Sequence, residues 1–272
     1  MKENIITTDF LTKFKNINVK LDGKPRKNLG RLFHESGECV FCNYKLNLEP
    51  NSNMILSENS SCFVIKNKWG IFNSEAEVIV TNKDVNVINH LDMEDIINFL
   101  NMLYDRYQIN KNIFKNVLTF INVGLFSGGS INHLHGQVVG VNENLSKVGE
   151  SFCDLDNILL DIGNSYTERL VLSGETGSII YIPVAGLVGG EIRILSHDIK
   201  SLASALFNLL NAIDISYSYS YNLVFHYIDN KYFVQYLPRH EIGIIYPTYL
   251  DTSINHYNNI EYFKNIVHNL FK

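Results

Sequence analysis

The sequence predicts an α+β protein made of two tandem halves, each an antiparallel sheet with packed helices, with the second half a degenerate copy of the first. Short apolar runs bounded by polar turns are typical of strands, and two longer stretches repeat apolar residues at helical spacing. The order strand, strand, helix, strand, strand occurs twice, at a period of roughly 110 residues. With 272 residues, of which 46% are hydrophobic, the chain can bury a sizeable core.

The first half is expected to comprise residues 1–145. Its first 38 residues are polar and weakly patterned, and we expect them to wrap the fold as an arm with a short strand or two. Strands are predicted over residues 62–65, 77–80, 117–122 and 134–140. A helix is predicted over residues 92–108, because apolar side chains recur there at helical spacing and Asp92 can cap its N-terminus.

The second half is expected to comprise residues 146–272 and to repeat this plan. Strands are predicted over residues 179–183, 191–195, 223–227 and 232–237, with a helix over residues 199–213. A last helix, which we expect to dock on the fold, is predicted over residues 253–272. Its apolar residues at helical spacing are Ile260, Phe263, Ile266, Val267 and Leu270.

Composition excludes several classes of partner. The formal net charge is -5 and the isoelectric point is about 6.0, and no basic patch indicates binding to nucleic acid or to a membrane surface. No apolar stretch reaches the roughly 18 residues of a transmembrane helix, and the N-terminus lacks the apolar core of a signal peptide. Four cysteines do not make a disulfide scaffold. We therefore expect a cytoplasmic protein.

The most informative stretch is residues 120–140, F-I-N-V-G-L-F-S-G-G-S-I-N-H-L-H-G-Q-V-V-G. His133, His135 and Gln137 alternate in an apolar run, so a strand would place all three on one face. The loop of glycine and serine before them can present backbone N–H groups to a phosphate. An isolated H-x-H is more often a pair of buried structural histidines, but the whole constellation favours chemistry at phosphorus with imidazole as the nucleophile.

This pattern resembles the active-site strand of the galactose-1-phosphate uridylyltransferases, the transferase branch of the histidine-triad superfamily. Leu134 replaces the proline that the family usually has between the histidines. The positions that match the family spacing are Asn122, Gly124, Gly128, Ser130, His133, His135 and Gln137. The resemblance implies two histidine-triad-like halves in one chain. The corresponding segment of the second half reads Y-F-V-Q-Y-L-P-R, without a histidine pair, so only the first half is expected to be catalytic.

The resemblance also assigns roles at the catalytic step. His135 attacks the α-phosphorus of a nucleoside diphosphate sugar, and a second phosphate then attacks the nucleotidyl-histidine. Ser130 and the amides of Gly128 and Gly129 bind the non-bridging oxygens. Gln137 stands where histidine-triad hydrolases have a third histidine, and an amide cannot transfer a proton. The leaving group must then be a weak base such as a sugar phosphate, which favours transfer or phosphorolysis over hydrolysis.

A metal site is expected near the N-terminus of the fold. Cys39 and Cys42 form a C-x-x-C pair, which in a reducing compartment is more often a metal knuckle or a redox pair than a disulfide. The resemblance assigns Cys39, Cys42 and His133 to a structural zinc ion. The family's fourth ligand, a histidine, is missing, and Asp84 is the candidate in its place. His90 is a longer reach, and a weak or absent metal is the remaining alternative.

A nucleoside pocket is expected from Asn67, Lys68 and Trp69, which resemble a family segment that lines it, together with Asn122. Trp69 could stack on a base, while an ordinary turn with a packed tryptophan is the alternative interpretation.

The function that the resemblance implies is nucleotidyl transfer, by an enzyme of the UDP-glucose–hexose-1-phosphate uridylyltransferase type. A nucleoside monophosphate would pass from a nucleotide sugar to a sugar 1-phosphate through a nucleotidyl-histidine. The alternatives are a dinucleotide polyphosphate or nucleotide-sugar phosphorylase, and a nucleotide-binding protein without turnover. The expected partners are small-molecule nucleotide sugars and sugar phosphates, with no nucleic acid and no membrane, and a homodimer is compatible with the resemblance.

Overall fold

The computed structural model describes residues 39–44, 55–67, 75–124, 127, 131–141, 168–171, 177–182, 191–213, 220–228 and 230–239. The arm expected over residues 1–38 and the helix expected over residues 253–272 lie outside these ranges.

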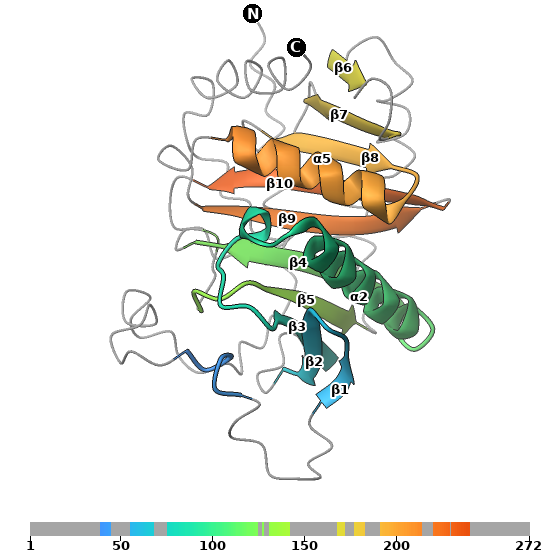
Figure 1. Cartoon of the computed structure of the whole chain (residues 1–272). Coiled ribbons are helices and arrows are strands. Elements are labelled where there is room, and N and C mark those ends of the chain that lie inside the picture. Colours follow the sequence, from blue (N-terminus) through green and yellow to red (C-terminus); the bar gives the residue numbers. More distant parts are fainter. Residues whose placement is uncertain are drawn as a thin grey trace, which may run out of the picture.

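The described residues form one antiparallel sheet of ten strands with two α-helices (Figure 1). The sheet order is β1-β2-β3-β5-β4-β9-β10-β8-β7-β6. The strands are β1 (Ile55–Glu58), β2 (Cys62–Lys66), β3 (Glu75–Thr81), β4 (Asn116–Val123), β5 (His135–Val141), β6 (Glu168–Val171), β7 (Ser178–Ile182), β8 (Ile192–Ser196), β9 (Ser220–Ile228) and β10 (Lys231–Arg239). The helices are α2 (Met93–Lys111) and α5 (Ile199–Ala212), with a 3-10 turn η3 (Ile88–His90) before α2.

The predicted α+β class is confirmed, and each strand and helix predicted within the described ranges is present. The two strands that the sequence did not reveal are β1 and β6, which form opposite edges of the sheet. Each has only four residues, and β1 alternates between half-buried and exposed positions. Such edge strands lack the apolar run by which inner strands are recognised.

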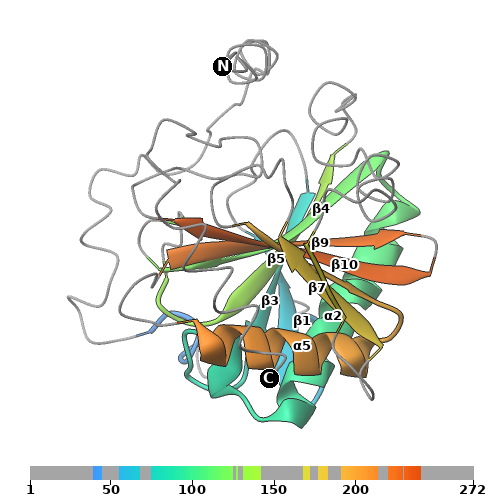
Figure 2. The same cartoon turned by 90° about the horizontal axis from the view of Figure 1, so that it is seen from above.

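Both helices cover the same face of the sheet (Figure 2). The predicted cap of α2 is confirmed, because the Asp92 carboxylate accepts a hydrogen bond of 2.9 Å from the N–H of Asp95. Asp198 caps α5 in the same way, accepting from the N–H of Ser201 at 2.8 Å. The apolar stripes of the two helices pack with the inward-facing residues of the sheet into one core.

Glycine at two positions of β5 lets the helical layer approach the sheet. A Cβ added at Gly136 would lie 2.5 Å from Leu103 Cδ2 of α2, and one added at Gly140 would lie 2.1 Å from Phe114. Gly136 and Val138 therefore face the helices, and the strand alternation turns His135 and Gln137 to the opposite face. We call this opposite side of the sheet the open face, because neither α2 nor α5 packs on it.

The centre of the sheet is the pairing of β4 with β9. Asn122 of β4 lies opposite Asn222 of β9, and Phe120 lies opposite Val224. This pairing joins strands β1 to β5 to strands β6 to β10 and brings two segments about 100 residues apart to the centre of the open face.

Candidate functional site

His135 is held as a neutral imidazole with one nitrogen available. Its Nδ1 lies 2.7 Å from the carbonyl oxygen of His133, an atom that can only accept, so Nδ1 carries the proton. Nε2 then has the lone pair. The side chain is 6% exposed, and burial lowers the pKa of His135 below its ordinary value. A neutral imidazole with its other nitrogen fixed by a backbone carbonyl is what nucleophilic attack requires.

His133 is oriented the other way, toward a cluster of metal-ligating side chains. Its Nδ1 lies 3.5 Å from the Sγ of Cys39, 3.5 Å from the Sγ of Cys42 and 3.3 Å from Oδ1 of Asp84. The four ligand atoms all lie within 4.8 Å of one another. Among the described residues, the predicted metal ligands thus come together with Asp84 as the fourth, and His90 is not part of the cluster.

The other nitrogen of His133 fixes this orientation. Nε2 donates to the carbonyl oxygen of Thr81 at 2.9 Å, and the Thr81 hydroxyl lies 3.2 Å away. A proton on Nε2 leaves the Nδ1 lone pair facing the two sulfurs and the carboxylate. Lys83, next to Asp84, is anchored in turn by ion pairs with Asp92 and Asp95 at the start of α2.

Four electron-rich groups thus converge with no described cation among them. Desolvation and, after it, the neighbouring Cys39 and Asp84 together raise the pKa of the Cys42 thiol to about 12. A divalent metal would replace the proton of Cys42 and coordinate the four groups, so the donor set fits a metal ion.

Phe41, inside the C-x-x-C segment, lies between the cluster and His135. Its ring centroid lies 5.7 Å from that of His133 and 5.1 Å from that of His135. It also packs on an apolar cluster of the open face that includes Val78 and Val80 of β3. A metal that fixes the C-x-x-C segment would therefore also fix one wall of the His135 site.

Gln137 lies on the open face of β5, between Val78 of β3 and Phe120 of β4. Its Oε1 is buried and has no hydrogen-bond partner among the described residues. A buried amide oxygen left without a partner costs free energy, and such atoms are usual where a ligand supplies the missing donor.

Asn122 lies on the strand next to His135. The register pairs Phe120 with Gln137 and Ile121 with Gly136, and one further step sets Asn122 across from His135 on the open face. Ser127 follows the end of β4, and its hydroxyl donates to the carbonyl of Gly124, which has a φ of 79° that favours glycine. The predicted phosphate-binding residues Gly128, Gly129 and Ser130 lie outside the described residues.

Asn67 of the expected nucleoside pocket lies at the far end of β3 from His135. Its N–H donates to the carbonyl of Ala76 at 2.7 Å, whereas His135 pairs with Val80. Lys68 and Trp69 lie outside the described residues, so their part in a nucleoside pocket stays a prediction.

Two features of the site differ from the sequence prediction or were missed by it. β5 begins at His135, so His133 lies in the bend before the strand and not in a row with His135 and Gln137. The reason is that the N–H of Leu134 donates to the carbonyl of Val85, which draws the chain away from the sheet register. Thr81 and Phe41 were missed, because a threonine and a phenylalanine in apolar segments carry no signal of a supporting role.

A second polar cluster lies on the open face in the later strands. The Nε2 of His226 donates to Oε1 of Gln235 at 2.9 Å, and the Gln235 amide donates to Glu191 at 3.0 Å. Arg193 donates to the same Glu191 oxygen at 2.6 Å. Burial lowers the pKa of His226 to about 4. These hydrogen bonds make a buried network that joins three strands.

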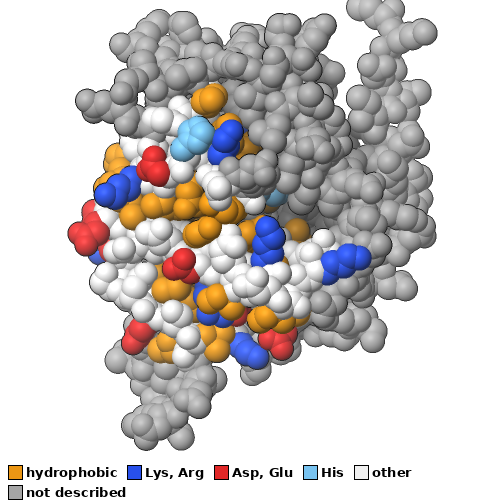
Figure 3. Space-filling model, turned by 90° about the vertical axis from the view of Figure 1, so that its right-hand side faces the viewer, with side chains coloured by type: hydrophobic (Ala, Val, Ile, Leu, Met, Phe, Trp, Pro, Cys, Tyr) orange, Lys and Arg blue, Asp and Glu red, His pale blue; other side chains and the backbone are white. Residues whose placement is uncertain are grey.

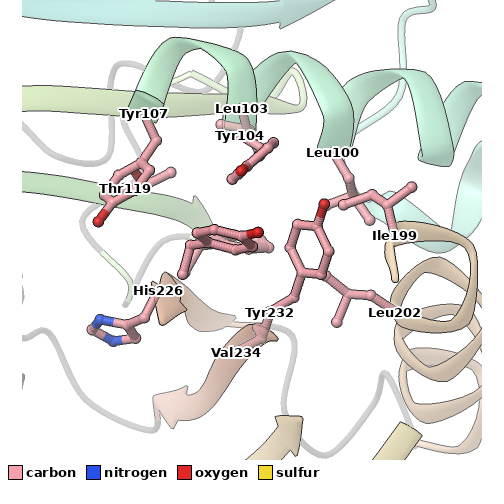
Figure 4. A pocket seen from close by; sticks show the side chains of 12 residues that line it. Leu100, Leu103, Tyr104, Tyr107, Thr119, Ile199, Leu202, His226, Tyr232 and Val234 are labelled. Atoms are coloured by element: carbon pink, nitrogen blue, oxygen red, sulfur yellow. The ribbon is translucent and has the colours of Figure 1, made fainter. Parts of the chain in front are cut away.

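A cavity beside the helices lies apart from the His135 site. It lies on the helix-covered face and is lined mainly by leucines and tyrosines, among them Leu100, Tyr104 and Tyr232 (Figure 4). The ring of His226 points away from the other lining side chains. An apolar lining offers no row of donors to a phosphate.

The described surface carries no concentration of one charge on the side shown in Figure 3, where acidic and basic side chains are scattered among apolar ones. Neither of the two described α-helices combines the length and hydrophobicity that crossing a bilayer requires.

Comparison with known proteins gives one match to a family model, over part of the chain. Residues 23–144 match the profile of the N-terminal domain of DUF4931, a domain of unknown function. No curated protein matches the chain significantly.

Solved structures match over most of the chain. A DUF4931 family protein from Bacillus cereus ATCC 10987 is 22% identical with a TM-score of 0.59, over 80% of this chain and 100% of that one. A uridylyltransferase is 13% identical with a TM-score of 0.60, over 87% and 93% of the two chains. An ADP-glucose phosphorylase from Arabidopsis thaliana, with bound ADP-glucose, is 17% identical with a TM-score of 0.56, over 74% and 80%. At these identities the likeness is one of fold. Residues 23–144 thus resemble the N-terminal domain of DUF4931, and the chain shares its fold with a uridylyltransferase and an ADP-glucose phosphorylase.

Proposed function

We propose that the protein is a nucleotidyltransferase that moves a nucleoside monophosphate from a nucleotide sugar to a sugar 1-phosphate through a covalent intermediate on His135. The single observation that carries the proposal is the state of His135. It is buried and neutral, with Nδ1–H donated to the carbonyl of His133 and Nε2 left as the nucleophile.

The first half-reaction is an in-line displacement at the α-phosphorus. The Nε2 lone pair forms the N–P bond, and the bond from phosphorus to the bridging oxygen breaks with its electron pair, which leaves as a sugar 1-phosphate. The positive charge that develops on the ring is stabilised by the Nδ1–H···O=C bond to His133. In the second half-reaction a phosphate oxygen of the acceptor attacks the same phosphorus, and the N–P electron pair returns to Nε2.

Gln137 supports transfer rather than hydrolysis. Its amide can hydrogen-bond to a phosphate or leaving group but can neither donate a proton to it nor activate water. The buried Oε1 without a described partner fits an oxygen that accepts from a substrate hydroxyl. Ser130, Gly128 and Gly129 complete the proposal as the groups that bind the non-bridging oxygens, and Asn67, Lys68 and Trp69 as the nucleoside contacts.

Inorganic phosphate is the second candidate acceptor. The fold is shared with an ADP-glucose phosphorylase, and the same His135–Gln137 pair would serve phosphorolysis of a nucleotide sugar without change. The nucleotidyl-histidine is common to both candidates, so the donor can be tested before the acceptor is known.

We further propose that the cluster binds a structural zinc ion through Cys39, Cys42, Asp84 and His133. With zinc–sulfur bonds of about 2.3 Å and zinc–nitrogen and zinc–oxygen bonds of about 2.0 Å, a tetrahedral ion sets sulfur and nitrogen about 3.5 Å apart and nitrogen and oxygen about 3.3 Å apart. The corresponding distances in the cluster are 3.5 and 3.3 Å. Bound zinc would brace the Cys39–Cys42 segment against the bend before β5.

The proposal includes two tandem histidine-triad-like halves, residues 1–145 and 146–272. Its support is topological: the order β1-β2-β3-β5-β4 on one side of the sheet repeats as β6-β7-β8-β10-β9 on the other. Gln137 lies opposite Phe120, and Gln235 lies opposite Val224, the partner of Phe120 across β4 and β9. Phe233 precedes Gln235 by two residues, as His135 precedes Gln137, so a phenylalanine stands where the first half has its histidine. The second half therefore lacks the proposed nucleophile.

The proposal is tested by intact-mass spectrometry of the protein incubated separately with UDP-glucose, ADP-glucose and a dinucleoside tetraphosphate. One donor is expected to add the mass of a single nucleoside monophosphate, and that mass names the base. Subsequent addition of galactose 1-phosphate, glucose 1-phosphate or inorganic phosphate should remove the adduct and identify the acceptor. Binding of these donors without any adduct, at saturating donor, would instead support a nucleotide-binding protein without turnover and contradict the proposal.

A further inference from the structure

The two asparagines at the centre of the sheet form a hydrogen-bonded pair between β4 and β9. Nδ2 of Asn222 donates to Oδ1 of Asn122 at 2.6 Å and to the backbone carbonyl of Ser127 at 3.0 Å. Asn222 is buried, at 1% exposed, while Asn122 is half-buried. One side chain of the later strands thus holds both a candidate substrate contact and the start of the phosphate-binding loop.

The backbone carbonyl of Ser127 determines the orientation of both amides. A carbonyl oxygen only accepts, so the group of Asn222 that faces it must be the NH2. The same NH2 faces Asn122, so the atom of Asn122 that meets it must be the oxygen. Asn122 is therefore left with its own NH2 as the group that it can offer elsewhere, and it lies across from His135 on the open face.

We propose that Asn222 is a positioning residue for the nucleotidyl-transfer site, which fixes the Asn122 amide so that its NH2 is offered to a phosphoryl oxygen and fixes the carbonyl of Ser127 at the head of the phosphate-binding loop. The inference rests on the proposed function and adds a residue of the second half to the site. A donor aimed in advance at the oxygens of the transferring group stabilises the charge there without reorganisation.

The substitution Asn222→Asp distinguishes a residue that orients the Asn122 amide from one that only stabilises the pairing of the two strands. A carboxylate at residue 222 can keep a hydrogen bond with residue 122, but only if Asn122 turns over and donates its NH2 to it. Asn122 would then present an oxygen to the substrate phosphate, and the carbonyl of Ser127 would face a carboxylate. A hydrogen bond between the strands survives, whereas the donor is lost.

Asn110→Asp is the matched control. Asn110 is also a buried asparagine, 3% exposed, and its Nδ2 donates to the carbonyl of Arg106 within α2 at 2.9 Å. It undergoes the same chemical change, away from the open face. The two variants therefore share the general cost of replacing a buried amide by a carboxylate.

The experiment compares the single-turnover labelling rate at saturating donor, the binding of the matching nucleoside monophosphate and the unfolding midpoint for wild type, Asn222→Asp and Asn110→Asp. We expect Asn222→Asp to label about a hundredfold more slowly than Asn110→Asp at a similar midpoint, as for a lost oxyanion donor. We also expect the difference in labelling rate between Asn222→Asp and Asn110→Asp to shrink when both variants also carry Asn122→Ala, because Asn222 acts through Asn122.

Equal labelling rates for the two variants would overturn the positioning role while leaving the proposed function intact. If the wild type binds the nucleoside monophosphate but is never labelled, the proposed function fails, and the positioning role is judged on binding. Weaker binding by Asn222→Asp than by Asn110→Asp would then uphold it, and equal binding would refute it. A wild type that neither labels nor binds would overturn both.

Discussion

His133 and His135 are two residues apart and carry their protons on different nitrogens. The carbonyl of Thr81 accepts a hydrogen bond from Nε2–H of His133, and the carbonyl of His133 accepts one from Nδ1–H of His135. The first ring therefore turns a lone pair toward Cys39 and Cys42, and the second leaves the lone pair on Nε2. Backbone carbonyls thus prepare two chemically identical side chains for the two roles that we propose, metal ligand and nucleophile.

Removal of the nucleophile gives the first prediction. His135→Gly should lose labelling by on the order of a thousandfold or more, because covalent catalysis is removed, and added imidazole should restore part of the turnover. His226→Gly, also a histidine of the open face, is the control, since we place no catalytic group in the second half. Labelling of His135→Gly at the wild-type rate, or its loss in folded His226→Gly, would mean that the active site has been misplaced.

The pKa of His135 predicts how labelling depends on pH. Since burial lowers this pKa below its ordinary value of 6.5, the ring stays neutral as the pH falls through 6.5. The labelling rate at saturating donor should thus be level from pH 8 to below 6.5 and decline only in more acidic solution. Stability should begin to fall at about pH 6.5, because the unfolded chain then takes up a proton that the folded ring does not. A labelling rate already halved at pH 6.5 would contradict the assignment.

Gln137 gives a prediction about the fate of the intermediate. Gln137→His restores an imidazole that can protonate a leaving group and activate water. We expect the nucleotidyl-enzyme of this variant to decay in buffer faster than that of the wild type. Gln137→Leu should not show this acceleration, since it adds no acid–base group. Equal lifetimes in buffer for the wild type and Gln137→His would count against the proposed role of the amide.

At the scale of elements, the Cys39–Cys42 segment and β5 are joined by the metal cluster and by the ring of Phe41 on His135. Protein purified without chelator should contain close to one zinc per chain. Cys39→Ala should lose the metal and the associated thermal stability, because zinc that binds only the folded chain stabilises it. Cys62→Ala removes a buried thiol outside the cluster and should retain zinc. Absence of zinc, with the thiols of Cys39 and Cys42 both freely titratable, would rule the site out.

Sequence predicted the elements well and their long-range partners poorly. Helix α2 and strand β5 were predicted because the periodicity of their apolar residues and the cap at Asp92 are local signals. β1 was missed because it is short, lies at an edge and is half exposed. The metal cluster was predicted from the resemblance, whereas Asn222 was not, because its role arises from the pairing of β4 with β9. Pairing between strands so far apart leaves no local pattern.

For the whole molecule, the sheet is continuous only because β4 pairs with β9. Residues 1–145 alone would expose the edge of β4, from Thr119 to Val123, with its backbone groups unpaired. We expect this fragment to associate with itself, and co-expressed residues 146–272 to suppress that association by restoring β9. Light scattering measures both. A stable monomeric fragment would contradict the idea that the two halves complete one sheet.

The central claim is that His135 carries a nucleotide during turnover. The direct measurement is peptide mapping of the labelled protein, quenched at alkaline pH because phosphorus–nitrogen bonds to imidazole break in acid. The account predicts one nucleoside monophosphate on the peptide that contains His135, on that residue by fragmentation, and its disappearance on brief acid treatment or on addition of the acceptor. An acid-stable adduct, or one on any other residue, would contradict the account.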